Sequence, residues 1–185
     1  MKTIDYGLEL KFSQAGETVQ VTDGTVIEGY ASLYGVPDQG GDVVQPGAYA
    51  RSLERLRARG GTVKMLWQHD PAQPIGVWDD IREDARGLYV KGRLLLDVER
   101  AREAAALIGA GAIDGLSIGY RTVSAQKDAK GQRLLAELEL WEVSLVTFPM
   151  LREARVTAKG DSPDPETWRE MVEALNGAAA ELARR

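Results

Sequence analysis

Segments in which polar and apolar residues alternate run along most of the chain. Such alternation predicts strands, because successive side chains of a strand point to opposite faces. The segments are residues 5–12, 25–35, 62–70, 75–84, 87–96, 114–126 and 132–148. A glycine-rich break follows the second of them, and the sequence KDAKG between the last two is typical of a hairpin loop. The pattern therefore predicts six or more strands.

Two further segments have helical spacing. Residues 45–61 contain Pro46 near the start and a glycine pair at residues 60–61, which are the usual places for these residues around a helix. The exposed face of this helix is expected to be basic. Residues 97–113 are rich in alanine, a strong helix former, and end in glycines that predict the helix stop.

The composition changes toward the C-terminal end. Residues 157–163 are polar and predict a linker, and residues 164–185 begin with Asp164 as an N-cap and Pro165 at the first helical position. An apolar stripe with helical spacing follows, formed by Trp168, Met171, Val172, Leu175, Ala179 and Leu182. We therefore predict a main domain over residues 1–156 and a separate amphipathic helix that serves targeting or assembly.

The order of these elements predicts the fold class. Strands outnumber helices, and two helices are embedded between strands, which is typical of a mainly β, α+β domain. We expect a closed or nearly closed β-barrel with the helices packed outside it. A chain of 185 residues with 44% hydrophobic residues is large enough to bury one sizeable core.

Charge and composition exclude several kinds of chemistry. The formal net charge is −5 and the basic residues are scattered, so we expect no direct nucleic-acid binding. The chain has no cysteine and one histidine, which excludes disulfides, thiol catalysis and sulfur-ligated metals, and we predict no metal and no cofactor. No apolar run approaches the roughly 20 residues that span a bilayer. The sequence therefore predicts a soluble, cytoplasmic protein without a membrane partner.

The strand pattern places one charged residue, Glu142, on an apolar face. Counting along residues 132–148 by twos puts its carboxylate on the same face as Leu138 and Leu140. A carboxylate turned toward a core costs several kcal/mol unless it is paired, so a partner is expected. An exposed strand end, a bulge that shifts the phase, or pairing with an arginine would also account for it.

Ser117, in the sequence GLSIGY, shares one face of its strand with Gly115 and Gly119. Small neighbours would leave open space above the hydroxyl, so that a substrate backbone could approach it. A serine beside glycines is more often a small packing residue. Position alone therefore makes it a candidate nucleophile, with packing as the simpler explanation.

His69, the only histidine, ends the strand predicted over residues 62–70, on the same side as Met65 and before a loop with two prolines. A hydrogen-bonded loop histidine is the simpler explanation. Together with Ser117 and Glu142 it could form a Ser-His-carboxylate relay, in which the histidine takes the serine proton and the carboxylate orients the imidazole.

The order of several motifs carries a more specific resemblance. GYASLYGVPDQGGDVVQPGAYARSL, VKMLWQHDPAQPIG, GLYVKGRL, GLSIGY and LWEVSLVTFPM follow one another between about residues 26 and 156. This series resembles the prohead (capsid maturation) proteases of tailed phages, whose fold is similar to that of herpesvirus assemblin. The compact size also resembles the version carried by gene transfer agents.

The resemblance implies a serine endopeptidase that cleaves scaffold or the N-terminal segment of the major capsid protein inside the assembling prohead in the host cytoplasm, with self-cleavage as a further option. It implies His69 and Ser117 as base and nucleophile. Assemblin uses a second histidine as the third member, which this chain lacks, and the resemblance to the phage branch implies an acidic residue in that place. We favour Glu142 over its rivals Asp70 and Asp114.

The oxyanion hole of assemblin-like enzymes comes from backbone after the last catalytic strand, which here implies Thr147 and Phe148. Pro149 has no N–H and cannot contribute. Homo-oligomerisation stays open.

Two other functions compete with the peptidase. A catalytically inert β-barrel assembly factor could bind capsid or scaffold protein through the C-terminal helix. A small-substrate esterase would fit the same three residues, but the chain lacks the GxSxG sequence around its serine.

Overall fold

The computed structural model describes residues 9–11, 19–22, 24–38, 40–129, 131–147 and 156–158. Of the predicted linker at residues 157–163, only Thr157 and Ala158 are among them, and both belong to a strand. The predicted helix at residues 164–185 lies outside the described residues, so the division into domains stays a prediction.

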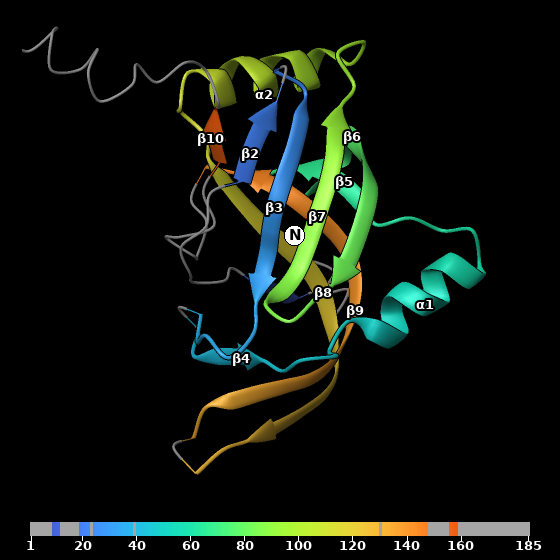
Figure 1. The fold of residues 1–185 in the computed structure, drawn as a ribbon, viewed down its shortest axis with the longest axis vertical. Helices are drawn as coiled ribbons and strands as arrows, with labels where there is room; N and C mark the ends of the chain where they lie inside the picture. Colours follow the sequence, from blue (N-terminus) through green and yellow to red (C-terminus); the bar gives the residue numbers. More distant parts are fainter. Residues whose placement is uncertain are drawn as a thin grey trace, which may run out of the picture.

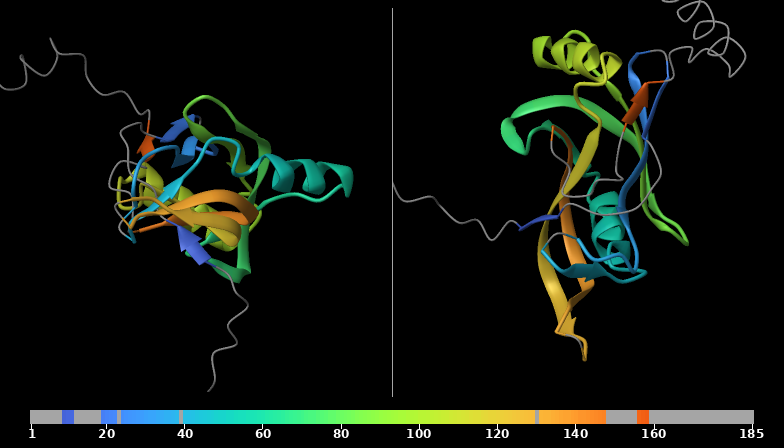
Figure 2. Two further views of the ribbon diagram at one scale, coloured as in Figure 1. Left: turned by 90° about the horizontal axis from the view of Figure 1, so that it is seen from below. Right: turned by 90° about the vertical axis from the view of Figure 1, so that its left-hand side faces the viewer.

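The described residues form one curled sheet of ten strands (Figures 1 and 2). The strands are β1 Glu9–Lys11, β2 Val19–Thr22, β3 Val26–Leu33, β4 Asp42–Val44, β5 Lys64–Trp67, β6 Asp70–Glu83, β7 Gly87–Leu94, β8 Gly115–Lys127, β9 Arg133–Val146 and β10 Val156–Ala158. Their order in the sheet is β1-β8-β9-β5-β6-β7-β3-β2-β10, and β4 pairs with β9 beside this path. The mainly β fold with outer helices is confirmed, as a half-barrel whose two end strands, β1 and β10, do not pair with each other.

Two helices flank the sheet. Helix α1, Ala50–Ala58, lies to one side of β6 and β9, and α2, Glu99–Gly109, crosses one end of the sheet (Figure 1). Helix α1 begins later than the sequence suggested, because Gly47 has a φ of 83° and belongs to a turn, where Ala50 N–H donates to its carbonyl. A residue with positive φ cannot continue a right-handed helix.

The hydrophobic core lies between the curled sheet and the helices. Its fully buried side chains come from most of the strands and include Ile27, Ile75, Leu88, Val90, Leu116, Ile118, Val143 and Leu145. Helix α1 adds Leu53, and α2 adds Ala101, Ala104 and Ile108. Removing this apolar surface from water supplies the main driving force for folding and fixes which face of each strand points inward.

The strand predicted over residues 62–70 is wrong at its end. It stops at Trp67, since Gln68 and His69 have φ values of 52° and 61° and turn the chain back into β6. The proline-containing loop expected next is also wrong, because β6 starts at Asp70 and includes both prolines. The pairing of β5 with β6 shifts register twice in this stretch, and irregular pairing is where a sheet tolerates proline.

Three short strands, β2, β4 and β10, were not predicted. None is longer than four residues, too short for alternation to be recognised in the sequence. Strand β4 follows directly on the predicted glycine-rich break and pairs in parallel with β9, where Val43 lies opposite Leu134.

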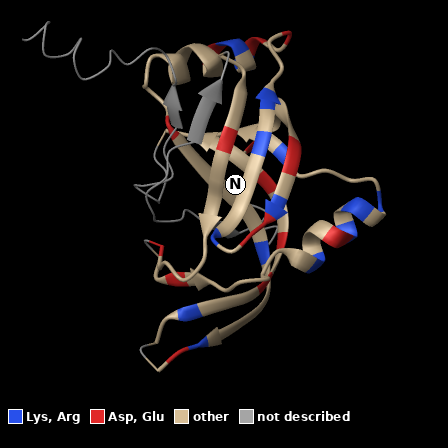
Figure 3. Ribbon diagram, viewed as in Figure 1, with Lys and Arg blue, Asp and Glu red and all other residues tan. Residues whose placement is uncertain are grey.

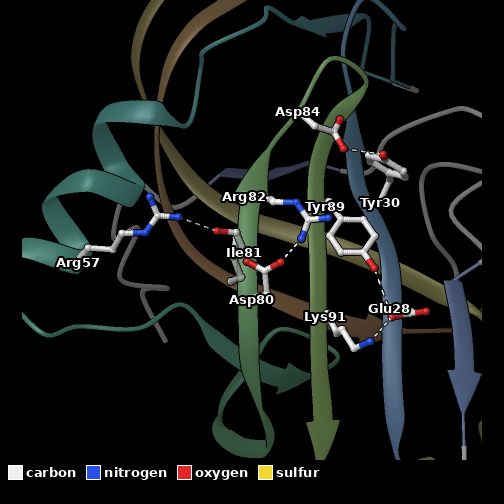
Figure 4. A network of polar contacts seen from close by, with 9 residues as sticks. All are labelled: Glu28, Tyr30, Arg57, Asp80, Ile81, Arg82, Asp84, Tyr89 and Lys91. Atoms are coloured by element: carbon white, nitrogen blue, oxygen red, sulfur yellow. Dashed lines mark hydrogen bonds and ion pairs between the residues drawn. The ribbon is translucent and has the colours of Figure 1, made fainter.

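A polar network covers one surface of β3, β7 and β6 (Figure 4). Lys91 bonds Glu28 at 2.8 Å, and this partner lowers the pKa of Glu28. Tyr30 donates to Asp84 at 2.6 Å, and its ring meets that of Tyr89 edge to face. Partial burial raises the pKa of Asp84, but the hydrogen bonds from Tyr30 and from the backbone outweigh it, so the pKa is lowered overall.

Residues of both charge signs are scattered along the described strands and helices, and several arginines lie on α1 (Figure 3). The basic face expected for this helix is therefore present. Neither described helix is both long enough and apolar enough to cross a bilayer.

Candidate active site

A β-bulge in β9 decides where Glu142 points. Gly119 of β8 pairs with Glu142, but the next residue, Tyr120, pairs with Leu140, so Trp141 is an extra residue on β9. A bulge of one residue reverses the alternation of faces. The expectation that Glu142 shares a face with the leucines of this strand is therefore wrong, and the bulge considered as an alternative is present.

Beyond the bulge, β8 and β9 present two different faces. The core face carries Leu116 and Ile118 of β8 and Val143 and Leu145 of β9. The opposite face carries three aligned pairs, namely Gly115 with Val146, Ser117 with Ser144, and Gly119 with Glu142. The small-residue face expected around Ser117 is thus present, and it also holds the candidate acid.

His69 reaches this face from the turn between β5 and β6. Strand β5 runs parallel to β9, with Leu66 opposite Ser144 and Trp67 opposite Leu145. The backbone N–H of Gln68 then donates to the carbonyl of Leu145 at 2.9 Å, which anchors the turn to β9. Two successive left-handed residues are what a two-residue hairpin of this type requires, and they aim the imidazole back along β9.

The imidazole and the candidate acid are in direct contact. His69 Nδ1 lies 2.5 Å from Glu142 Oε1, and the two side chains are only 11% and 5% exposed. The other carboxylate oxygen, Oε2, accepts a hydrogen bond of 2.5 Å from Ser144 Oγ. Both oxygens of a nearly buried carboxylate are therefore bonded, as such a group requires.

Ser117 lies directly across from Ser144 and is fully buried. Cβ atoms of opposite residues in an antiparallel pair are about 4.5–5.5 Å apart. The structure thus brings the candidate nucleophile beside a residue that contacts both His69 and Glu142.

Gly119 has a different use from the one its sequence position suggested. We expected open space there for a substrate backbone, but a Cβ built on Gly119 would overlap the carboxylate of Glu142. The space that the missing side chain leaves is filled by the acid.

The two residues expected at the oxyanion hole have different outcomes. Thr147 follows β9, and its N–H donates to Gln68 Oε1 at 3.4 Å, while Gln68 Nε2 donates to the Thr147 hydroxyl at 2.6 Å. Phe148 lies outside the described residues.

The rival acids occupy other places. Asp70 begins β6, and its Oδ1 accepts a hydrogen bond from Ala72 N–H at 2.9 Å, so it stabilises the start of that strand. Asp114 precedes β8 and is half-buried. The carboxylate of Glu142, by contrast, bonds the histidine ring.

Sequence reasoning missed two residues of this site, Ser144 and Gln68. Ser144 follows Glu142 by two positions and so shares its face, a signal that strand periodicity does contain. Gln68 gives no such signal, because its contacts with Thr147 depend on the left-handed turn. Within the described ranges no cluster of three or more histidine and acidic side chains could hold a metal ion.

Comparisons with known proteins show which family the chain resembles. The family model of the caudovirus prohead serine protease matches residues 13–166. Over 178 residues the chain is 30% identical to the prohead protease of Enterobacteria phage HK97, covering 92% of this chain and 74% of that protein.

Among solved structures, the bacteriophage T4 capsid assembly protease has a TM-score of 0.57 at 20% identity, with 77% of this chain and 99% of that one covered. The varicella-zoster virus protease is less similar, with a TM-score of 0.39 at 15% identity over 69% and 60% of the two chains.

The protein is thus a serine peptidase built on a curled sheet, with a fold similar to that of the bacteriophage T4 capsid assembly protease. It belongs to the caudovirus prohead serine protease family, which accounts for the whole order of sequence motifs from the first long strand to the end of β9.

Proposed function

We propose that this capsid maturation protease cleaves peptide bonds with Ser117 as nucleophile, His69 as general base and acid, and Glu142 as the group that orients the imidazole. The contact of 2.5 Å between His69 Nδ1 and Glu142 Oε1 is the observation that carries the proposal. With Nδ1 committed to the carboxylate, Nε2 is the ring nitrogen that exchanges protons with the serine.

The reaction then runs in two halves. Ser117 Oγ attacks the scissile carbonyl carbon while its proton passes to His69 Nε2, and the imidazolium gives this proton to the leaving amine as the C–N bond breaks. Water attacks the resulting ester with His69 again accepting a proton, which returns to Ser117. The buried charge of Glu142 stabilises the imidazolium in both halves.

Backbone N–H groups just after β9 would bind the oxyanion in this scheme, with Thr147 and Phe148 as the candidates. The bond from Thr147 N–H to Gln68 is 3.4 Å long. A bond of this length is weak, so a developing oxyanion could replace the amide oxygen as its acceptor.

The proposed substrates are scaffold protein, the N-terminal segment of the major capsid protein and the chain itself, cleaved inside the assembling capsid in the host cytoplasm. The similarity to a prohead protease and to a capsid assembly protease supports this class of substrate. No feature of the described site favours one of the three.

Co-expression with the capsid precursor tests the proposal. We expect Ser117→Ala and His69→Ala each to lower the rate of processing by about 10⁴-fold or more, and Glu142→Gln by about 10³- to 10⁴-fold. Intact mass of the capsid protein reads the cleavage. Ser124→Ala is the matched control, since Ser124 lies on the same strand as Ser117 but is exposed. Normal processing by the Ser117 or His69 variant would exclude this triad.

A further inference from the structure

Ser144 is a second buried serine in the site, and the scheme above gives it no task. It lies on β9 between Ser117 of β8 and Leu66 of β5, and it is fully buried. It shares the site face with Glu142, two residues earlier on the same strand.

The Ser144 hydroxyl makes two bonds that join the acid to the base. It donates to Glu142 Oε2 at 2.5 Å and accepts from the backbone N–H of His69 at 3.2 Å. Since His69 Nδ1 bonds the other oxygen of the same carboxylate, a closed ring of contacts runs from the histidine backbone through Ser144 and Glu142 back to the imidazole.

The direction of these bonds distinguishes Ser144 from a nucleophile. Its proton goes to a carboxylate, and one of its lone pairs accepts an N–H of the left-handed turn, so the oxygen is held by both neighbours. A backbone in the left-handed region is unfavourable for residues other than glycine and persists only where surrounding contacts hold it. The hydroxyl supplies such a contact at His69, whose φ is 61°.

We propose that Ser144 is a positioning residue of the proteolytic reaction, which fixes the carboxylate of Glu142 and the turn carrying His69 relative to each other. This inference rests on the proposed function, since it assigns a task within the same site. The hydroxyl acts on the rate through the geometry and charge of the His69–Glu142 pair and does not touch the substrate.

Loss of the hydroxyl has two expected effects. The carboxylate loses one of its hydrogen-bond donors, so its charge acts more strongly on the imidazolium and the acid limb of the pH–rate profile moves to higher pH. The buried N–H of His69 also loses its acceptor, so the turn loosens and kcat falls while KM stays constant.

Other charged residues of the described chain lie on the elements that carry the pair. Asp70 follows His69 at the start of β6, and Lys64 of β5 lies opposite Glu142 in the register and is exposed. On the site face of β8, Arg121 follows Gly119 by two positions and is ion-paired with Glu139 of β9. Substituting Ser144 alters none of these charges. A shift of the acid limb in a Ser144 variant is therefore read as a change in the His69–Glu142 pair.

The experiment compares Ser144→Ala with Ser52→Ala. Ser52 is also buried, and its Oγ accepts from the Leu140 N–H of β9 at 2.9 Å, so both variants lose a buried hydroxyl bonded to backbone. We expect similar losses of thermal stability in the two. Only Ser144→Ala should lower kcat, by about 10- to 100-fold, and move the acid limb by about one pH unit, the size expected for one hydrogen bond to a charged group.

A second measurement needs neither substrate nor turnover. His69 is the only histidine of the chain, so one set of imidazole NMR signals reports its titration in the folded protein. We expect Ser144→Ala to shift this titration and Ser52→Ala to leave it unchanged. Ser144→Thr, which keeps the hydroxyl, should resemble wild type more closely than Ser144→Val, because valine has the shape of threonine without the hydroxyl.

The outcomes separate the two proposals. An unchanged His69 titration and pH profile in folded Ser144→Ala overturns the positioning role, even where Ser117→Ala abolishes cleavage. A shifted titration in Ser144→Ala together with normal cleavage by Ser117→Ala keeps the linkage of Ser144 to His69 and overturns the proposed triad.

Discussion

Gly119 is the residue whose small size the site uses most directly. It lies opposite Glu142 in the β8–β9 pair, and any Cβ at this position would overlap the carboxylate. The carboxylate can therefore lie flat against β8, within reach of both His69 and Ser144.

We expect Gly119→Ala to displace Glu142 and to lower kcat by at least about 10²-fold, because small displacements of catalytic groups cost rates of this order. Gly109→Ala is the control, since no atom lies within 4 Å of a Cβ there and alanine is the better helix former at the end of α2. Peptide cleavage rates and thermal unfolding of both variants check this. Equal activity of Gly119→Ala and wild type would mean that the carboxylate needs no such space.

The sequence was informative about individual residues where motifs repeat a family pattern, and silent where a contact depends on backbone conformation. His69, Ser117 and Glu142 were all chosen in advance, but Glu142 was chosen partly from a phase count that the bulge makes invalid. Gln68 could not be found, because no pattern of residue types predicts two left-handed residues at positions other than glycine, asparagine or aspartate.

At the scale of elements, the turn between β6 and β7 is held by one aspartate. Asp84 Oδ1 accepts from the N–H groups of Arg86 and Gly87 at 2.8 and 3.2 Å, and Oδ2 accepts from Tyr30 of the neighbouring β3. The pKa of Asp84 is lowered by these bonds despite its partial burial. The ionised form therefore joins three strands at one end of the sheet.

We expect Tyr30→Phe to lower the free energy of unfolding at pH 7 by about 1 kcal/mol, a typical value for one hydrogen bond. A carboxyl whose folded pKa is lowered stabilises the fold above its ordinary value, 3.8 here, and loses this contribution as the pH falls through the folded value. The difference between variant and wild type should hence shrink below about pH 4. Urea unfolding at pH 7 and pH 3 measures it.

Tyr89→Phe is the comparison, because the Tyr89 hydroxyl bonds Glu28 at a longer distance of 3.3 Å. It should destabilise less than Tyr30→Phe at pH 7. A Tyr30→Phe effect that stays constant down to pH 3 would show that its hydroxyl does not act through ionised Asp84.

Long elements were predicted well and short ones were not. The strands that became β3, β7, β8 and β9 follow from alternation, and both helices follow from helical spacing with their ends displaced by a few residues. The starts and ends depend on turns such as the one at Gly47, and the short strands depend on partners far along the chain, neither of which local sequence encodes.

At the scale of the molecule, the described sheet and helices form one core. The sequence motifs follow one another along the chain in the same order as the elements from β3 to β9. The hairpin of β8 and β9 supplies Ser117, Glu142 and Ser144, while His69 comes from the β5–β6 turn beside it. Three of these four residues thus lie on the two described strands that share the longest run of paired residues.

The amphipathic helix predicted at residues 164–185 is the part we propose to be separable from this core. We expect deletion of residues 162–185 to leave peptide cleavage by the purified chain within about twofold of wild type and to reduce its incorporation into proheads. Cleavage assays and protein analysis of isolated proheads check the two halves. A deletion variant that fails to fold would instead make the segment part of the core.

The extra residue at Trp141 also bears on how the gene can change in length. Beyond the bulge one face of β9 is apolar and buried in the core, and the other carries Glu142 and Ser144. Inserting or removing one codon between Glu142 and Val146 would therefore exchange core residues for residues of the site face. The hairpin loop at residues 128–132 has no such alternation of faces to preserve. We therefore expect insertions and deletions among related sequences to occur at that loop and to be absent from the strand beside it.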